Sequence, residues 1–271
     1  MLYAMKPRIA FLGNGNMGWS VLSGALDASV LAPSEVLVIE HDANAAARAA
    51  ARGVTIAPLH EATRADILFL AVKPQNFQSL AQELGPLPDR RVVISVMAGL
   101  SSTSIRNALG QMAAVVRVMP NTPARIGAGI SAICAGDGAT DDDLTFPHEL
   151  MAAVGTVVRV SEENMFAVTA TSGSGPAFVL RMAEAMEQAA IKEGIECETA
   201  RVLVQQTILG TAKLMVESGD EPAVLRAAVT SKGGTTAAGL DAMSAANFDD
   251  AVAAAIHAAS ARGIELGNEN S

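Results

Sequence analysis

The feature that most constrains the fold is a glycine-rich turn at residues 9–18, which read IAFLGNGNMG. Four apolar residues enter the turn, its glycines have the spacing G-x-G-x-x-G, and a helix-forming segment follows over residues 17–28. Gly13 permits the tight turn, Gly15 lets a pyrophosphate approach the backbone, and Gly18 brings the helix close to the strand. An ordinary glycine-rich turn has the same pattern, so the surrounding sequence decides between the two interpretations.

The surrounding sequence alternates short apolar runs with helical patterns. We expect strands at residues 8–12, 35–39, 54–57, 66–72, 92–96 and 115–119, with helices between them, for example at residues 43–51, Phe77–Leu84 and Ser102–Leu109. Such alternation indicates an α/β fold, a doubly wound parallel sheet covered on both faces. Residues 127–135 are expected to add a strand at the sheet edge, and residues 157–160 one more. This context favours a Rossmann domain whose loop binds a dinucleotide through Gly13, Asn14, Gly15, Asn16, Met17 and Gly18.

The residue after the second expected strand is Glu40, which lies 22 residues beyond Gly18. An acidic side chain there accepts hydrogen bonds from the adenine ribose of NAD, whereas a 2′-phosphate favours an Arg. The loop contains a second carboxylate, Asp42, and has no Arg before Arg48. We therefore expect NADH to be favoured over NADPH, with use of both retained. The alternative is that Glu40 faces solvent and Asp42 only caps the following helix.

Ligands of doubly wound sheets bind outside the carboxyl ends of the strands, so the loops after later strands are further candidates. These loops contain Val72, Lys73 and Pro74, then Ala98 and Gly99, then Asn121. Lys73 could meet a phosphate or a negatively charged substrate, and Asn121 could bind a nicotinamide carboxamide. Taken singly, each fits a solvated loop residue equally well.

The composition limits which classes of partner the protein is expected to bind. The 271 residues carry a net charge of −9, which disfavours nucleic acid and anionic membranes. No run reaches the roughly 18 apolar residues of a membrane span, and the N-terminus lacks a signal-peptide layout. Cys134 and Cys197 lie far apart and are expected to be buried thiols in a reducing cytoplasm. With only four scattered histidines, no metal site is expected.

The sequence pattern in the second half of the chain predicts helices. We place the domain boundary between residues 1–162 and 163–271. Helices are expected at residues 176–193, 199–217, 222–229, 237–244 and 248–262, and a disordered tail at residues 265–271. The first helix is apolar over most of its circumference and must be buried. About a hundred residues offer little room for that, so we predict an obligate dimer with interleaved helices.

A second glycine-rich element, TSKGGTT at residues 230–236, precedes the helix expected at residues 237–244. Its hydroxyls, paired glycines and helix start bring free backbone N–H groups into one concavity, which suits a carboxylate or phosphate. An interhelical loop capped by Thr235 or Thr236 is the alternative.

Five segments, in this order and spacing, resemble pyrroline-5-carboxylate reductase. They are residues 13–18, VKP at 72–74, MPNTP at 119–123, SGSGPAF at 172–178 and the second glycine-rich element. The resemblance covers roughly residues 9–262, and its most specific part is residues 230–240. It implies a Rossmann domain followed by a helical dimerisation domain, with dimers often assembled into decamers. It also implies reduction of 1-pyrroline-5-carboxylate to L-proline by NADH or NADPH.

The resemblance further implies roles for the second glycine-rich element. Ser231, Gly233, Gly234 and Thr235 would bind the substrate carboxylate, and Thr236 would direct its hydroxyl to the ring nitrogen. In the family, the substrate site is partly contributed by the dimer mate. Two residues depart from the family pattern: Lys232 replaces a common Pro, and Glu40 stands where members that prefer NADPH have small or polar residues. We expect Lys232 to face solvent.

Two other functions remain open. A related imine reductase or a 3-hydroxyacid dehydrogenase has the same two-domain plan, but those enzymes usually place a catalytic Lys or Asp on the long helix after the boundary. Residues 172–186 contain no Lys, and the nearest is Lys192. A non-catalytic dinucleotide sensor would have no use for the second glycine-rich element.

Overall fold

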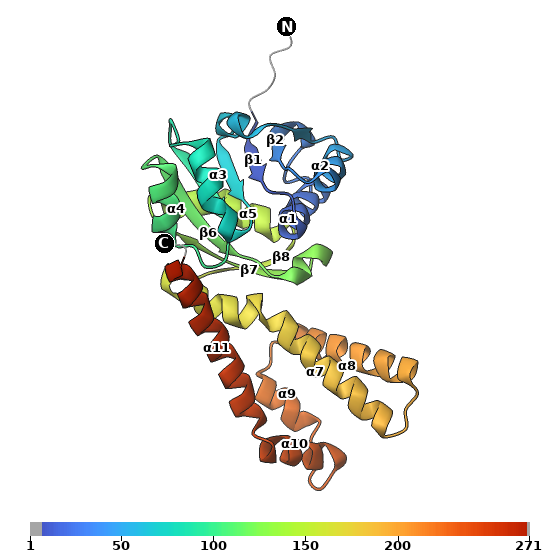
Figure 1. Cartoon of the computed structure of the whole chain (residues 1–271). Helices are drawn as coiled ribbons and strands as arrows, with labels where there is room; N and C mark the ends of the chain where they lie inside the picture. Colours follow the sequence, from blue (N-terminus) through green and yellow to red (C-terminus); the bar gives the residue numbers. More distant parts are fainter. Residues whose placement is uncertain (1–6, 270–271) are drawn as a thin grey trace. The chain divides into compact units, whose positions relative to one another are not determined.

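The computed structural model describes residues 7–269 and divides the chain into two compact units (Figure 1). Among the described residues, the first comprises residues 7–174 together with residues 258–269, and the second comprises residues 175–257. Each unit is described separately below. None of the helices in the described part of the chain has the length and apolar character needed to cross a membrane.

Within residues 7–269 the first unit forms one sheet with strand order β3-β2-β1-β4-β5-β6-β7-β8. The strands are β1 (Ile9–Leu12), β2 (Val36–Ile39), β3 (Thr55–Ile56), β4 (Ile67–Leu70), β5 (Arg91–Ser95), β6 (Ala113–Met119), β7 (Gly129–Ala135) and β8 (Gly155–Arg159). All neighbouring strands are parallel except β6 and β7. The expected doubly wound Rossmann domain is therefore confirmed, with one antiparallel pair added.

The position of β7 differs from the expectation. This strand lies between β6 and β8 and is not at the edge of the sheet. The connection from β6 to β7 is short and contains only the 3₁₀ turn η4 (Thr122–Ile126). Because a parallel pairing needs a crossover of a dozen or more residues, this connection can form only an antiparallel pair.

Helices cover both faces of the sheet, as Figure 1 shows. Alternate residues of β1 point to opposite faces, so Ile9 and Phe11 join one core cluster and Ala10 and Leu12 the other. The first cluster includes residues of α1 (Asn16–Asp27), α2 (Ala43–Ala50) and α5 (Thr145–Ala152). The second includes residues of α3 (Phe77–Leu84) and α4 (Ser102–Leu109).

Short turns that the apolar periodicity did not indicate connect these elements. They are η1 (Pro33–Glu35), η2 (Leu59–Arg64), η3 (Pro74–Asn76), η5 (Asp141–Leu144), η6 (Glu162–Asn164), the short helix α6 (Met165–Val168) and the π-helical turn η7 (Thr169–Gly173). Each is too short to show a helical period in the sequence.

The second unit consists of helices, as expected. It contains α7 (Gly175–Lys192), α8 (Cys197–Ser218), α9 (Pro222–Ala228), α10 (Thr235–Ala245) and the first part of α11 (Phe248–Glu269). Helix α7 has no buried residue in the single chain. Leu180, Val202 and Val216 are 64%, 63% and 79% exposed. Apolar exposure on this scale is typical of an interaction site.

Two expectations are corrected by the structure. The residues expected to form a disordered tail continue α11 as far as Glu269, and only residues 270–271 lie outside the described part. Gly267 is buried there because its missing side chain lets the helix pack against Phe166 and Gly99. Cys134 is buried as expected, but Cys197 begins α8 and is exposed in the single chain.

Candidate active site

A cleft of about 650 Å³ opens where the chain leaves β1, between the ends of β2 and β4. This is the topological switch point of the sheet, since the connections from β1 and β4 run to opposite sides. Its lining residues come from four segments: Gly13, Gly15 and Asn16; Ile39, Glu40, His41 and Asp42; Asn44, Ala45 and Arg48; and Ala71, Val72, Lys73, Asn76 and Leu80.

The three glycines of the first loop have different surroundings. Gly13 has φ +96°, and a Cβ added there would lie 2.8 Å from the Ala71 carbonyl oxygen. A Cβ on Gly18 would lie 2.5 Å from the Gly13 oxygen, so this glycine lets α1 start close to β1. Gly15 has no neighbouring atom within 4 Å of such a Cβ. The backbone of Gly15 is thus open on the side where a pyrophosphate would approach.

The Glu40 carboxylate is held by three backbone N–H groups. Asn14 donates to Oε2 at 2.6 Å, while His41 and Asp42 donate to Oε1 at 2.7 and 2.9 Å. The side chain therefore does not extend freely into solvent, and its charge is fixed at the cleft. Asp42 also caps α2, because its Oδ1 accepts a 2.8 Å hydrogen bond from the N–H of Ala45.

The other candidates of the first unit fall into two groups. Val72 and Lys73 line the same cleft, and Pro74 begins η3 beside it. Ala98, Gly99 and Asn121 do not line the cleft. Gly99 has φ +78° and packs against Leu266, and the Asn121 amide accepts from the N–H of Ile130 and donates to the Ser172 carbonyl. The cofactor roles of these three residues stay predictions.

Within the loop, Asn14 is fully buried and donates from Nδ2 to the Ala45 carbonyl at 2.8 Å. Gly18 is also buried, and Met17 is half-buried. These three residues do not line the cleft, whereas Gly13, Gly15 and Asn16 do.

The second glycine-rich element lies in the other unit, between α9 and α10. Gly233 has φ +71°, and the N–H of Gly234 donates to the Ser231 carbonyl at 3.0 Å. Gly234 precedes α10, and no side chain caps this helix. The first backbone N–H groups of a helix have no partner within it, so an anion can bind them here. The side chains of Ser231, Lys232, Thr235 and Thr236 are exposed in the single chain.

Two family models match this chain. The model described as pyrroline-5-carboxylate reductase dimerisation matches residues 162–266, and the one described as NADP oxidoreductase coenzyme F420-dependent matches residues 8–99. A pyrroline-5-carboxylate reductase of Haemophilus influenzae is 38% identical over 265 residues, which cover 95% of this chain and 97% of that protein. The chain belongs to the pyrroline-5-carboxylate reductase family.

Other members of the pyrroline-5-carboxylate reductase family agree with this assignment. Pyrroline-5-carboxylate reductase 2 of Bacillus subtilis is 34% identical, over 96% of this chain and 95% of its own. A solved pyrroline-5-carboxylate reductase of Coxiella burnetii has a TM-score of 0.89 and 32% identity, covering 96% of this chain and 98% of its own. The Plasmodium falciparum enzyme, solved with NADP bound, has a TM-score of 0.85 and 26% identity, over 96% and 98% of the two chains. The hydroxyacid dehydrogenase alternative is not favoured.

In this member of the family, a further residue of the cleft was missed from the sequence. Arg48 on α2 lines the cleft, donates from Nη2 to the Asn14 carbonyl at 2.8 Å, and places its guanidinium carbon 4.5 Å from the centre of the Trp19 ring. Because Arg48 is separated from Glu40 in the sequence, the sequence did not indicate that both residues line one cleft. Helical spacing was the available signal, because Ala45 and Arg48 are three apart and share one face of α2.

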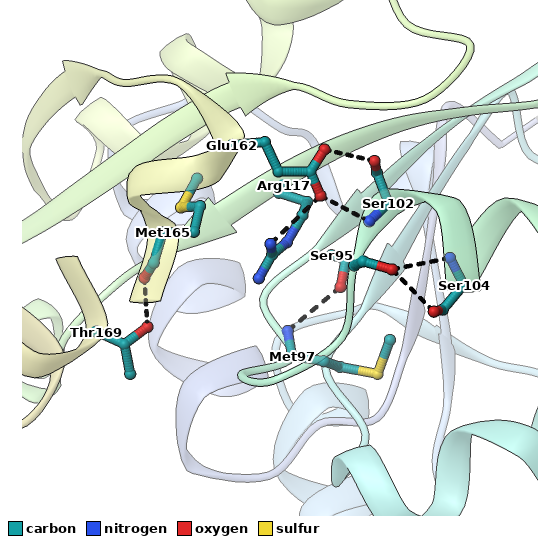
Figure 2. A network of polar contacts seen from close by, with 9 residues as sticks. Ser95, Met97, Ser102, Ser104, Arg117, Glu162, Met165 and Thr169 are labelled. Carbon is teal, nitrogen blue, oxygen red and sulfur yellow. Dashed lines mark hydrogen bonds and ion pairs between the residues drawn. The ribbon is translucent and has the colours of Figure 1, made fainter. Parts of the chain in front are cut away.

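A second polar group lies deeper in the first unit (Figure 2). Arg117 on β6 is 6% exposed, and its Nη1 lies 3.3 Å from Oε1 of Glu162. Glu162 also accepts hydrogen bonds from the N–H and hydroxyl of Ser102, at 2.8 and 2.5 Å. The network ties β6 and the start of α4 to the first residue that matches the family dimerisation model.

Proposed function

We propose that this protein reduces 1-pyrroline-5-carboxylate to L-proline with NADH or NADPH. The observation that carries the proposal is the presence of both glycine-rich elements in a chain that is similar to these reductases over almost its whole length. The first element borders a cleft at the switch point of the sheet, and the second opens an uncapped helix. One element suits the hydride donor, and the other suits the carboxylate of the acceptor.

The cofactor is proposed to bind with its pyrophosphate at Gly13, Gly15 and Asn16, and its adenine ribose near Glu40. Three of the roughly four acceptor sites of the Glu40 carboxylate are taken by backbone N–H groups. The site that remains, on Oε2, can accept from a ribose hydroxyl, which favours NADH. A 2′-phosphate would meet the same negative charge. Use of both cofactors is nevertheless proposed, because Lys73 and Arg48 bring two positive charges to the cleft.

The substrate carboxylate is proposed to bind the backbone N–H groups and hydroxyls of Ser231, Gly233, Gly234 and Thr235. A carboxylate at the start of α10 would satisfy donors that no side chain caps and would gain from the helix dipole. Lys232 is exposed and is proposed to face solvent.

Hydride transfer to C5 of the imine sends the C=N electron pair to the ring nitrogen, which must hold or receive a proton. Thr236 is proposed to hydrogen-bond this nitrogen through its hydroxyl. Because a cyclic imine is basic enough to be partly protonated near neutral pH, no strong side-chain acid is required. Catalysis then rests mainly on orientation and on the cofactor's chemistry.

The helical part is a self-association domain by its family match. We propose an obligate dimer with interleaved helices, which would cover the exposed apolar side chains of α7 and α8. The resemblance extends this proposal to rings of dimers such as decamers, and to a functional division between residues 1–162 and 163–271. A cytoplasmic location is proposed on the same basis.

The direct test is to mix the purified protein with 1-pyrroline-5-carboxylate and follow NADH or NADPH oxidation, with proline identified as the product. Omission of the imine is the control. Cofactor oxidation that does not depend on the imine, or no oxidation at all with a folded dimer, would refute the proposed activity. A comparison of kcat/KM for the two cofactors tests the Glu40 preference, and a large preference for NADPH would overturn it.

A further inference from the structure

The glycine loop is held on two sides by residues of opposite charge. Glu40 accepts from the Asn14 N–H, and Arg48 donates to the Asn14 carbonyl. Both side chains also line the cleft. The cleft therefore presents a fixed carboxylate and a guanidinium, both anchored to the backbone of one residue.

The Arg48 guanidinium has unused donors. Nη2 bonds Asn14, but Nε is buried and has no hydrogen-bond partner, and Nη1 makes no hydrogen bond to any residue in the described range. An arginine carries five N–H donors, and a buried donor without an acceptor costs free energy. Nε is enclosed by protein, so Nη1 is the donor that can reach a ligand, on a side chain that lines a cleft with the features of a nucleotide site.

The guanidinium is also held in place before any ligand arrives. Its central carbon lies 4.5 Å from the centre of the Trp19 ring, which is within the range of a cation–π contact. An arginine held in this way loses little side-chain entropy when it binds a phosphate, and its planar fork matches phosphate oxygens.

We propose that Arg48 is a specificity-determining residue that binds the 2′-phosphate of NADPH and offsets the repulsion from Glu40. This inference rests on the proposed use of nicotinamide cofactors. Glu40 favours NADH through the ribose hydroxyls, and Arg48 restores affinity for NADPH. The balance of these two side chains sets the ratio of the two affinities.

The test measures Kd for NADPH and for NADH by titration calorimetry, without the imine. Arg48→Met removes the guanidinium and keeps an apolar contact with Trp19. We expect Kd for NADPH to rise roughly 10-fold or more, as for the loss of a charge-assisted hydrogen bond, and Kd for NADH to rise about 3-fold or less. Arg48→Lys should give an intermediate value for NADPH, and Glu40→Gln should shift the ratio the other way.

Arg52→Met is the matched control, because Arg52 lies in the turn just after α2, pairs with Asp27 and does not line the cleft. Thermal unfolding of each variant reports whether it keeps the fold, since Trp19 fluorescence would change directly when the guanidinium beside its ring is removed. An equal loss of affinity for the two cofactors in Arg48→Met, or no loss of affinity for either, would overturn the inference. Binding of neither cofactor by the unmodified protein would overturn both the inference and the proposed function. Normal binding without imine reduction would overturn only the proposed function.

Discussion

The hydroxyl of Ser102 donates a 2.5 Å hydrogen bond to Glu162, and the Ser102 N–H donates another at 2.8 Å to the same carboxylate. The bond joins the first turn of α4 to the segment after β8, although the two residues lie sixty positions apart in the sequence. A carboxylate at the start of a helix is stabilised by the helix dipole. In Figure 2 the same carboxylate also reaches Arg117, so it joins three elements of the first unit.

Removal of this carboxylate should destabilise the first unit. Glu162→Ala leaves Arg117, whose side chain is 7% exposed, without its ion-pair partner. Since an unpaired buried charge is costly, we expect the free energy of unfolding to fall by about 2–4 kcal/mol, measured by urea unfolding. Ser102→Ala keeps the ion pair and should cost only about 1 kcal/mol. Equal losses in the two variants would contradict this role for Glu162.

The elements of this network show which parts of the fold could be predicted. The alternation of apolar runs with helical patterns and the glycine spacing predicted the sheet and the tight turn after β1, because both are local patterns. The partner of Arg117 could not be predicted, since β6 and η6 meet only in the folded chain. The same holds for Arg48, whose distance from Glu40 in the sequence concealed its place in the cleft. The end of α11 was missed because its buried residue is Gly267, and a glycine does not add to an apolar pattern in the sequence.

The packing of Gly267 predicts that this position does not accept a side chain. A Cβ there would lie 3.0 Å from the Phe166 ring and 3.2 Å from the Gly99 carbonyl oxygen. Gly267→Val should lower the free energy of unfolding by about 1–3 kcal/mol, as overpacking does, and lower Tm accordingly. Asn268→Val, at the adjacent exposed position, is the matched control. Equal Tm values for the two variants would show that this end of α11 does not pack as described.

Cys134 predicts a pH dependence of stability. Burial, followed in size by the charge of Glu162, raises the pKa of the Cys134 thiol from 9.0 to about 11. Between these values the unfolded thiol loses its proton while the folded thiol keeps it, so stability should fall as pH rises from 9 towards 11. The measurement is urea unfolding at pH 8 and pH 10. In Cys134→Ala the decrease between these two pH values should be smaller, and an unchanged decrease would rule out the thiol as its source.

The exposed apolar surface of the helical unit predicts that a charged side chain placed on it will weaken self-association. Leu180 on α7 is 64% exposed in the single chain, and a partner chain would bury it. Leu180→Glu should therefore weaken self-association by at least about 10-fold, as measured by sedimentation at several concentrations, because an unpaired charge is costly in an apolar interface. Ile126→Glu is the matched control, since Ile126 is 81% exposed but lies in the first unit. A stable, folded monomer of the unmodified chain on dilution would refute the obligate dimer.

Thr236 gives the sharpest prediction about the reaction itself. Its hydroxyl is exposed at the start of α10 in the single chain, and the proposed hydrogen bond to the ring nitrogen strengthens as the imine is reduced. Thr236→Ala should lower kcat/KM for the imine by roughly 10–1000-fold, while Kd for the cofactor stays unchanged. Thr236→Ser keeps the hydroxyl and should restore most of the activity.

The split between kcat and KM separates this role from simple substrate binding. Loss of an interaction made mainly in the transition state lowers kcat, whereas loss of uniform binding raises KM alone. The adjacent Thr235→Ala is therefore the matched comparison, because Thr235 is proposed to bind the carboxylate and its loss should act mainly on KM. Near-normal kcat in Thr236→Ala, with or without a change in KM, would refute the role proposed for its hydroxyl.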